Sequence, residues 1–223
     1  MKGARHLSKQ EIQSLAQFFY GEYEVRNRTL FLLDLNIGTR ISELLALNVG
    51  DVWQYGKPVE ILELRKAITK GKKTRQIPLN DQAREVITEL IEWKKSQGER
   101  LLPNAPLFAS RKGNNRLSRY QVHRILKESF QSSECSGKVS THSLRKSFAK
   151  ALLVSGNNLR AIQILLGHTS LATTEKYLAV SPDELTRAVN SLGLCLIPIG
   201  LPGASQAFIF RDSSQEMERV RGV

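Results

Sequence analysis

The chain of 223 residues is poor in cysteine and lacks long apolar runs. Its two cysteines, Cys135 and Cys195, lie far apart and outside any Cys-x-x-Cys pair, so neither a disulfide framework nor a zinc site is indicated and a reducing compartment fits best. The late apolar run of residues 194–201 is short and contains Pro198, so it cannot span a bilayer. Because no basic and then apolar leader opens the chain, we expect a soluble, cytoplasmic protein without a membrane partner.

Acidic residues are also in short supply. The chain has 33 lysines and arginines against 21 aspartates and glutamates, which gives a formal net charge of +12. This excess indicates a polyanionic partner, most simply nucleic acid. The basic residues are spread along the chain rather than collected in one tail, which favours folded surfaces that follow a phosphate backbone. The alternative is a basic protein that is merely soluble.

Helix-start signals and hydrophobic spacing predict an α+β fold that is mostly helical, with one main domain. Capping-box patterns predict two helix starts, at Ser8 and at Ser118, and the helix from Ser8 is expected to run to about Gly21. Asn80 or Asp81 caps a third helix. The other predicted helices lie on either side of Gly38, from Thr141 to Gly156, from Asn158 to Gly167, around Tyr177 and after Ser181. β-branched and aromatic residues over 52–55, 59–68 and 74–79 predict a small antiparallel sheet, with Lys70 at its last hairpin turn.

Two arginines and a histidine are candidates for binding a phosphate. His142 and Arg145 are three residues apart on one face of a predicted helix, so both can reach the same phosphate, although such a pair taken alone is more typical of a solvated helix face. Arg40 begins a helix that Ile41 and Leu44 anchor in the core. Planar guanidinium groups match the nonbridging oxygens, on which negative charge grows during displacement at a phosphodiester.

The sequence offers no Asp/Asp/Glu cluster of the kind that two-metal nucleases use, so a route without metal or cofactor fits better and the protein must supply the nucleophile. Tyr177 is the candidate nucleophile, and a packed aromatic residue is the alternative. A phenol has an ordinary pKa of about 10; nearby arginines lower it, and His142 could accept the proton. Lys70 is suited to protonate the departing 5′ oxygen, with Lys72 and Lys73 as rivals.

His168 directly follows Gly167, which is a typical helix-stop residue. Its imidazole is therefore expected to project from a turn rather than from a core face, where it could donate a hydrogen bond to the phosphate. A structural histidine that holds the turn is the alternative.

Five segments of the chain resemble the motifs of tyrosine recombinases of the phage integrase family, in their catalytic domain. They are Gly38-Thr39-Arg40-Ile41-Ser42-Glu43-Leu44, the segment at the hairpin lysine Lys70, His142-Ser143-Leu144-Arg145, Leu166-Gly167-His168, and Thr173-Thr174-Glu175-Lys176-Tyr177-Leu178. The spacing between His168 and Tyr177 also agrees with the family pattern. The resemblance covers roughly residues 8–192 and implies the catalytic-domain fold of that family.

The resemblance implies a role for each motif. The residues expected to hold the scissile phosphate are Arg40, Arg145 and His168. Lys70 would be the general acid, His142 the proton acceptor, and Tyr177 would form a 3′-phosphotyrosyl link. Because that link conserves bond energy, neither ATP nor a metal is implied, and a 5′ hydroxyl from a second strand completes the exchange. Glu43 resembles an acidic residue that orients the site, and an ordinary helix carboxylate is the alternative.

The resemblance also implies a division into domains. Family members usually carry an N-terminal helical domain that clamps DNA, whereas here the motifs begin at Gly38. We expect a catalytic domain over residues 1–192 without this core-binding domain. The chain would then belong to the short subgroup that includes fimbrial-switch invertases, be a fragment, or work with a helper protein. The tail over residues 193–223 is expected to dock into a neighbouring protomer, or else to be disordered or packed locally.

The function expected from these observations is site-specific recombination of double-stranded DNA. The outcome would be integration, inversion or resolution, which depends on the DNA sites. The expected partners are further copies of the chain, as a tetramer on paired sites, and an accessory DNA-binding protein. A DNA-binding regulator or accessory factor built on the same fold is the alternative, and a basic RNA-associated module is a more distant one because no aromatic RNA-stacking signature is present.

Overall fold

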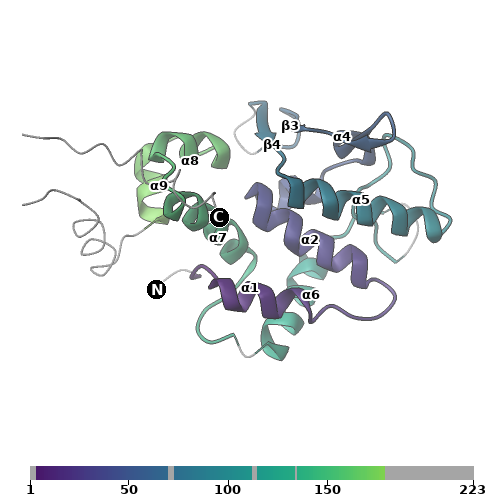
Figure 1. Ribbon diagram of the computed structural model, residues 1–223, viewed down its shortest axis with the longest axis horizontal. Helices are drawn as coiled ribbons and strands as arrows, with labels where there is room; N and C mark the ends of the chain where they lie inside the picture. Colours follow the sequence, from purple (N-terminus) through teal and green to yellow (C-terminus); the bar gives the residue numbers. More distant parts are fainter. Residues whose placement is uncertain (1–3, 70–72, 112–114, 134, 179–223) are drawn as a thin grey trace, which may run out of the picture. The chain divides into compact units, whose positions relative to one another are not determined.

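The computed structural model describes residues 4–69, 73–111, 115–133 and 135–178, which form helices and short strands (Figure 1). The helices are α1 (Lys9–Ala16), α2 (Glu24–Ile37), α3 (Ile41–Leu45), α4 (Val49–Val52), α5 (Asp81–Ser96), α6 (Arg119–Ser132), α7 (Thr141–Val154), α8 (Leu159–Leu166) and α9 (Leu171–Tyr177). The strands are β1 (Trp53–Gln54), β2 (Lys57–Pro58), β3 (Ile61–Leu64) and β4 (Arg75–Pro78). The mostly helical α+β class is therefore confirmed.

The helices begin where the capping signals predicted. The Ser8 side chain accepts a hydrogen bond from the Glu11 backbone N–H at 3.1 Å, and the Glu11 carboxylate accepts one from the Ser8 N–H at 2.8 Å, so α1 starts with a complete capping box. Ser118 caps α6 in the same way, and the Asn80 side chain caps α5. The first helix ends at Ala16, well before the expected Gly21.

The predicted antiparallel sheet exists as two separate hairpins, β1 with β2 and β3 with β4. In the second hairpin Leu64 pairs with Arg75 and Ile61 with Pro78. Side chains alternate along each strand. Leu64 on β3 and Arg75 and Ile77 on β4 are buried, and the alternate residues of both strands are exposed. The inner face of this hairpin thus carries one buried arginine. Lys70, predicted at its turn, lies outside the described residues.

Helix α2 is the centre of the main hydrophobic core. It packs against both α5 and α7 (Figure 1), and its Leu30, Phe31, Leu33 and Ile37 are fully or almost fully buried. Apolar residues lie on several of its faces because it is covered from more than one side. It ends at Gly38, whose left-handed φ of 58° suits glycine.

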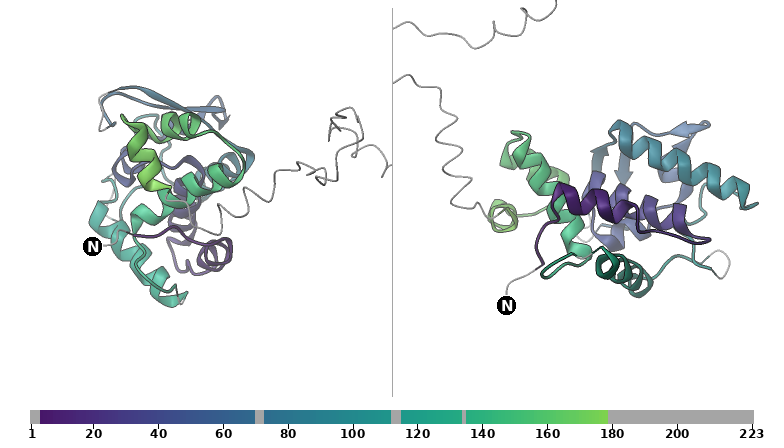
Figure 2. Two further views of the ribbon diagram at one scale, coloured as in Figure 1. Left: turned by 90° about the vertical axis from the view of Figure 1, so that its left-hand side faces the viewer. Right: turned by 60° about the horizontal axis from the view of Figure 1, so that its bottom comes forward.

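A second, smaller core joins the last helices, which lie together in both figures (Figure 1 and Figure 2). Its buried residues are Phe148, Ala149, Ile162, Leu166 and Leu178. Helix α7 contributes to both cores, since Leu144 belongs to the first and Phe148 to the second. Arg145, between those two residues in the sequence, is therefore carried into the junction of the cores.

The described residues belong to one compact unit, over residues 1–179. The predicted helix after Ser181 and the predicted tail over 193–223 lie outside the described residues. In the ranges that the structure describes, every helix is either too short or too polar to cross a membrane.

Candidate active site

Glu43, in the first turn of α3, is a fully buried carboxylate that binds two arginines. One oxygen accepts from Arg40 Nη1 at 2.8 Å, and the other accepts from Arg75 Nη2 at 2.9 Å and from the Arg40 backbone N–H at 3.1 Å. Burial by itself raises the pKa of Glu43, but the Arg40 backbone hydrogen bond and the Arg75 charge outweigh it, so the pKa lies below its ordinary value. Glu43 is therefore an ionised anchor for both arginines.

The backbone carbonyl of Leu166, at the end of α8, is shared by two arginines. It accepts from Arg75 Nη1 at 2.8 Å and from Arg145 Nη2 at 2.6 Å. The other terminal nitrogen of Arg145 donates to the carbonyl of Gly38 at 2.6 Å. The last carbonyls of a helix have no partner within it and carry partial negative charge, so the ends of α2 and α8 are natural places for guanidinium groups. Arg145 thereby ties these two helix ends together.

His168 follows the left-handed cap of α8 at Gly167, as the sequence predicted. Its Nδ1 lies 3.0 Å from the hydroxyl of Thr174 on α9, and its carbonyl accepts from Gln163 Nε2 at 3.0 Å. Burial, and then the charges of Arg145 and the two other arginines, lower the pKa of His168 to about 4. The imidazole is therefore neutral at pH 7, with one ring nitrogen able to donate and the other to accept.

An open cavity of about 800 Å³ lies beside this cluster. Its charged and histidine lining residues are Arg40, Lys73, Arg75, Arg160 and His168, and none of the described lining residues is acidic. Thr69 also lines it, so residues on both sides of the predicted Lys70 reach the cavity wall. Because Glu43 is fully buried, the cavity presents cations to solvent and keeps their counter-charge inside the protein. Such a cavity suits an anion.

The cluster contains Arg40, Glu43, Arg145 and His168 among the residues singled out from the sequence. Arg145 is only 3% exposed, because α7 lies between the two cores at this position. Arg145 therefore does not share a solvated helix face with His142.

The other predicted residues are placed less fully. His142 is exposed in the first turn of α7, where its backbone N–H donates to Ser140 Oγ at 3.3 Å, and in the described part of the chain its ring takes no part in the hydrogen bonds of the cluster. Tyr177 is the last residue of α9, and its side chain lies outside what the structure describes.

Two residues of the site were missed by reasoning from sequence. Buried and exposed side chains alternate along β4, and Arg75 lies on the buried face with Ile77. A charged residue at such an inward position was the sequence signal that could have identified Arg75. Thr174 belongs to a quoted motif, but only the fold shows that its hydroxyl reaches His168. Among the described residues, no three histidine, cysteine, aspartate or glutamate side chains are grouped so that they could hold a metal ion.

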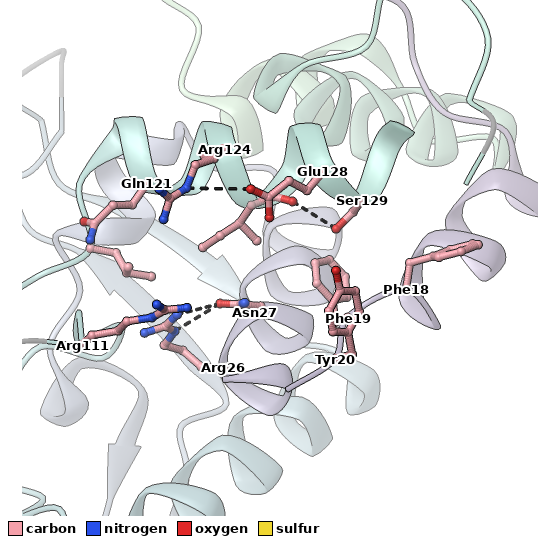
Figure 3. Close-up of a pocket in the computed structure, with 12 residues that line it drawn as sticks. Phe18, Phe19, Tyr20, Arg26, Asn27, Arg111, Gln121, Arg124, Glu128 and Ser129 are labelled. Carbon is pink, nitrogen blue, oxygen red and sulfur yellow. Dashed lines mark hydrogen bonds and ion pairs between the residues drawn. The ribbon is translucent and has the colours of Figure 1, made fainter. Parts of the chain in front are cut away.

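A smaller pocket, of about 180 Å³, lies between the α1–α2 connection and α6 (Figure 3). It is also lined by arginines, which are Arg26, Arg111 and Arg124. Arg26 donates to the Ala109 carbonyl at 2.8 Å and to Asn27 Oδ1 at 2.9 Å. None of the described residues that line this pocket is a predicted site residue, so the cavity beside Glu43 is the candidate active site.

Comparison with known proteins gives the family and the fold. The family model described as "Phage integrase family" matches residues 5–184. A tyrosine recombinase of Thermosipho africanus is 34% identical over 186 residues, which are 83% of this chain and 61% of the relative. The tyrosine recombinase XerC of Vibrio campbellii is 36% identical over 167 residues, which are 74% of this chain and 50% of the relative. The chain thus spans between half and two thirds of the length of these relatives.

Solved structures agree. The XerA recombinase superposes with a TM-score of 0.71 at 24% identity, over 85% of this chain and 65% of that one, which shows the fold. The XerH site-specific recombinase, in a post-cleavage complex with a palindromic difH substrate, superposes with a TM-score of 0.69 at 25% identity, over 83% of this chain and 52% of that one.

Proposed function

The chain belongs to the phage integrase family, and on that premise we propose that it is a site-specific recombinase that cuts and rejoins double-stranded DNA. The observation that carries the proposal is the cavity in which Arg40 and His168 face solvent while their partners, Glu43 and Thr174, are fully buried. Cations held in place before the substrate arrives stabilise developing charge without reorganising, which is what phosphoryl transfer requires. The XerH relative was solved on its DNA substrate, which supports DNA as the partner here.

In the proposed reaction, Arg40, Arg145 and His168 hold the nonbridging oxygens of the scissile phosphate. The Glu43 carboxylate fixes the orientation of Arg40 because it accepts hydrogen bonds from both the side chain and the backbone N–H of Arg40. If the Thr174 hydroxyl donates to Nδ1 of the neutral His168, the remaining ring proton is on Nε2, which then donates to the phosphate. The arginines supply charge and His168 supplies a neutral, directional hydrogen bond.

The nucleophile in this proposal is Tyr177. Its phenol oxygen forms a bond to phosphorus while the bond from phosphorus to the 5′ oxygen breaks, which leaves a 3′-phosphotyrosyl link. His142 accepts the phenol proton and Lys70 gives a proton to the departing 5′ oxygen, so the step is balanced. A 5′ hydroxyl from a second strand then attacks the link and releases Tyr177. Because the link keeps the bond energy, the route needs neither ATP nor a metal.

The expected assembly and setting are part of the same proposal. Strand exchange needs two DNA duplexes, so we infer that the chain acts as a tetramer on paired sites, in the cytoplasm, with an accessory DNA-binding protein as a further partner. The catalytic domain would occupy residues 1–192, and residues 193–223 would dock into a neighbouring protomer.

The test is a covalent trap. The protein is incubated with nicked DNA that carries a site selected from genomic or random sequence, and the adduct is measured on a denaturing gel. We expect an adduct that Tyr177→Phe abolishes. An adduct that survives this substitution means that another residue is the nucleophile. If the wild type binds the selected site but neither forms an adduct nor relaxes supercoiled DNA, the chain is a DNA-binding regulator instead.

A further inference from the structure

We propose that Arg75 is a positioning residue for strand cleavage: it fixes the positions of the two phosphate-binding arginines, Arg40 and Arg145, and of His168 relative to one another. The inference rests on the proposed function, since it concerns the same site. Arg75 comes from β4, the strand that pairs with β3, and it contacts groups from two other elements, α3 and α8. It therefore connects parts of the site that are far apart in the sequence.

The two contacts of Arg75 reach the partners of both phosphate-binding arginines. Its Nη2 donates to the Glu43 carboxylate at 2.9 Å, and that carboxylate also holds Arg40. Its Nη1 donates to the Leu166 carbonyl at 2.8 Å, and that carbonyl also holds Arg145. Displacing Arg75 therefore changes the hydrogen bonding of both at once.

The close approach of Arg75 to the end of α8 depends on Gly167. A Cβ at position 167 would lie 2.0 Å from Arg75 Nη1, where no real contact is that short. The same glycine has a φ of 64°, which allows the chain to turn from α8 directly into His168. The close approach of Arg75 and the turn into His168 thus both require a glycine at position 167.

The stability of the fold alone does not account for this arginine. Arg75 is 9% exposed and its partner Glu43 is fully buried, and a buried ion pair is often no more stabilising than well-packed apolar residues. In the described part of the chain, the buried Nε of Arg75 also has no hydrogen-bond partner, which is a further cost. An arrangement that costs stability and connects both phosphate-binding arginines indicates a role in positioning.

Arg75→Lys tests the inference with the charge retained. A single ammonium lacks the two fixed terminal nitrogens of a guanidinium, so it cannot hold Glu43 and the Leu166 carbonyl in the same geometry. Misplacement of a reacting constellation by about 1 Å costs about 100-fold in rate, and we expect a loss of that order in cleavage of ordinary DNA.

The decisive measurement compares two substrates with the same enzyme preparation. One carries the ordinary scissile phosphate, and the other a methylphosphonate there, prepared as both stereoisomers. The methyl group removes the negative charge that the arginines neutralise, so cleavage of this substrate depends less on their exact placement. We expect the loss of rate caused by Arg75→Lys to be smaller on the methylphosphonate than on ordinary DNA by about 10-fold or more. A factor of about 10 corresponds to one weak interaction between the arginines and the missing charge. The ratio does not depend on the fraction of protein that is folded.

The matched control is Arg28→Lys. Arg28 also ties two elements together, through Glu24 on α2 and Glu89 on α5, but it does not line the cavity. We expect it to leave the substrate ratio unchanged. Equal losses on both substrates with Arg75→Lys, or no loss at all, would overturn the positioning role while the wild-type adduct stands. A wild type that cleaves neither substrate would instead overturn the proposed function, and this inference with it.

Discussion

Two regions of the molecule gather arginines around a hollow, yet they hold them differently. In the cavity beside α3, Arg40 and Arg75 share one buried, ionised carboxylate. In the pocket beside α6 (Figure 3), Arg26 is buried against an amide oxygen and a backbone carbonyl, and its guanidinium lies 4.2 Å from the centre of the Tyr23 ring. The first region keeps its counter-charge buried. In the second, the buried Arg26 has neutral partners, and the carboxylate beside Arg124, that of Glu128, is exposed.

The difference also affects the pKa of the buried arginine in each region. Burial lowers the pKa of Arg26 to about 10, and the charges of Glu99 and Glu22 oppose this effect only in part. For Arg75 burial also lowers the pKa, but the Glu43 charge acts against it. The buried carboxylate thus opposes the effect of burial on Arg75 and holds Arg40 at the cavity wall. The pocket beside α6 has the residue types of a phosphate site without this organisation.

The largest expected effect comes from removing a buried arginine in each region. Arg145→Ala leaves the carbonyls of Gly38 and Leu166 without its two hydrogen bonds and removes a proposed phosphate ligand. We expect strand cleavage to fall by about 1,000-fold, as when a preorganised donor to a transition state is lost. Arg26→Ala should lower stability but leave cleavage per folded molecule unchanged.

Cleavage rates are measured on a nicked site and divided by the folded fraction from circular dichroism. Arg145→Lys, which keeps the charge but cannot hold both carbonyls, covers the case in which the alanine variant does not fold. Comparable losses for the two alanine variants would mean that the cavity is not the site of chemistry.

Next in size is the effect of neutralising the carboxylate. Glu43→Gln leaves Arg75 buried without its ionic partner, and breaking a buried pair in this way costs about 3 kcal/mol or more in the free energy of unfolding. The matched change is Glu128→Gln, at an exposed residue whose carboxylate lies 3.9 Å from Arg124, and we expect it to stay within about 0.5 kcal/mol of the wild type. Urea unfolding measures both, and similar values for the two variants would contradict the role given to Glu43.

The comparison also explains what the sequence could and could not predict. Ser8, Asn80 and Ser118 act on backbone groups only a few residues away, so the starts of their helices were predictable from local spacing. Arg40 and Glu43 are neighbours on one helix turn, and their pairing belongs to the same class of short-range contact.

Long-range contacts were not predictable in this way. Arg75 meets Glu43 and Leu166 only because β4 lies between the start of α3 and the end of α8. The burial of Arg145 depends on two separate cores that meet at α7. Local spacing does not specify which elements pack together, so the residues that join them had no distinct signal beyond a charge at an inward position.

A smaller effect is expected in how stability depends on pH between about 4 and 7. The pKa of His168 is lowered to about 4 from 6.5, so in this range the unfolded chain binds more protons and stability rises with pH. The pKa of buried Asp34 is raised to about 7 from 3.8, mainly by burial, so the folded chain binds more protons and stability falls with pH. The two contributions oppose each other in the wild type.

Single substitutions should separate them. His168→Gln should make stability fall more steeply with pH, and Asp34→Asn should make it rise, each by at most about 1.4 kcal/mol per pH unit, the limit for one proton. The His168 change should be the smaller because His168 is partly exposed and solvent screens its charge, whereas Asp34 is fully buried. Arg26→Ala should leave the slope unaltered, since a pKa of about 10 lies above this range. Urea unfolding in half-unit pH steps measures the slopes, and two variants that shift in one direction would contradict the assignment.

The smallest effect tests whether a single hydroxyl matters differently in the two regions. Thr174→Val keeps the shape of the side chain but removes the oxygen that lies 3.0 Å from His168 Nδ1. The loss of one buried hydrogen bond should cost about 1 kcal/mol of stability, and cleavage should fall further because the His168 ring is no longer held in one orientation. Thr174→Ser should restore both. In the pocket beside α6, the buried Ser129 hydroxyl donates to the Ile125 carbonyl of its own helix at 3.1 Å. Ser129→Ala should therefore be nearly neutral, because that bond competes with the helix rather than orienting another group. Equal cleavage by Thr174→Val and the wild type would show that His168 is positioned by its turn alone.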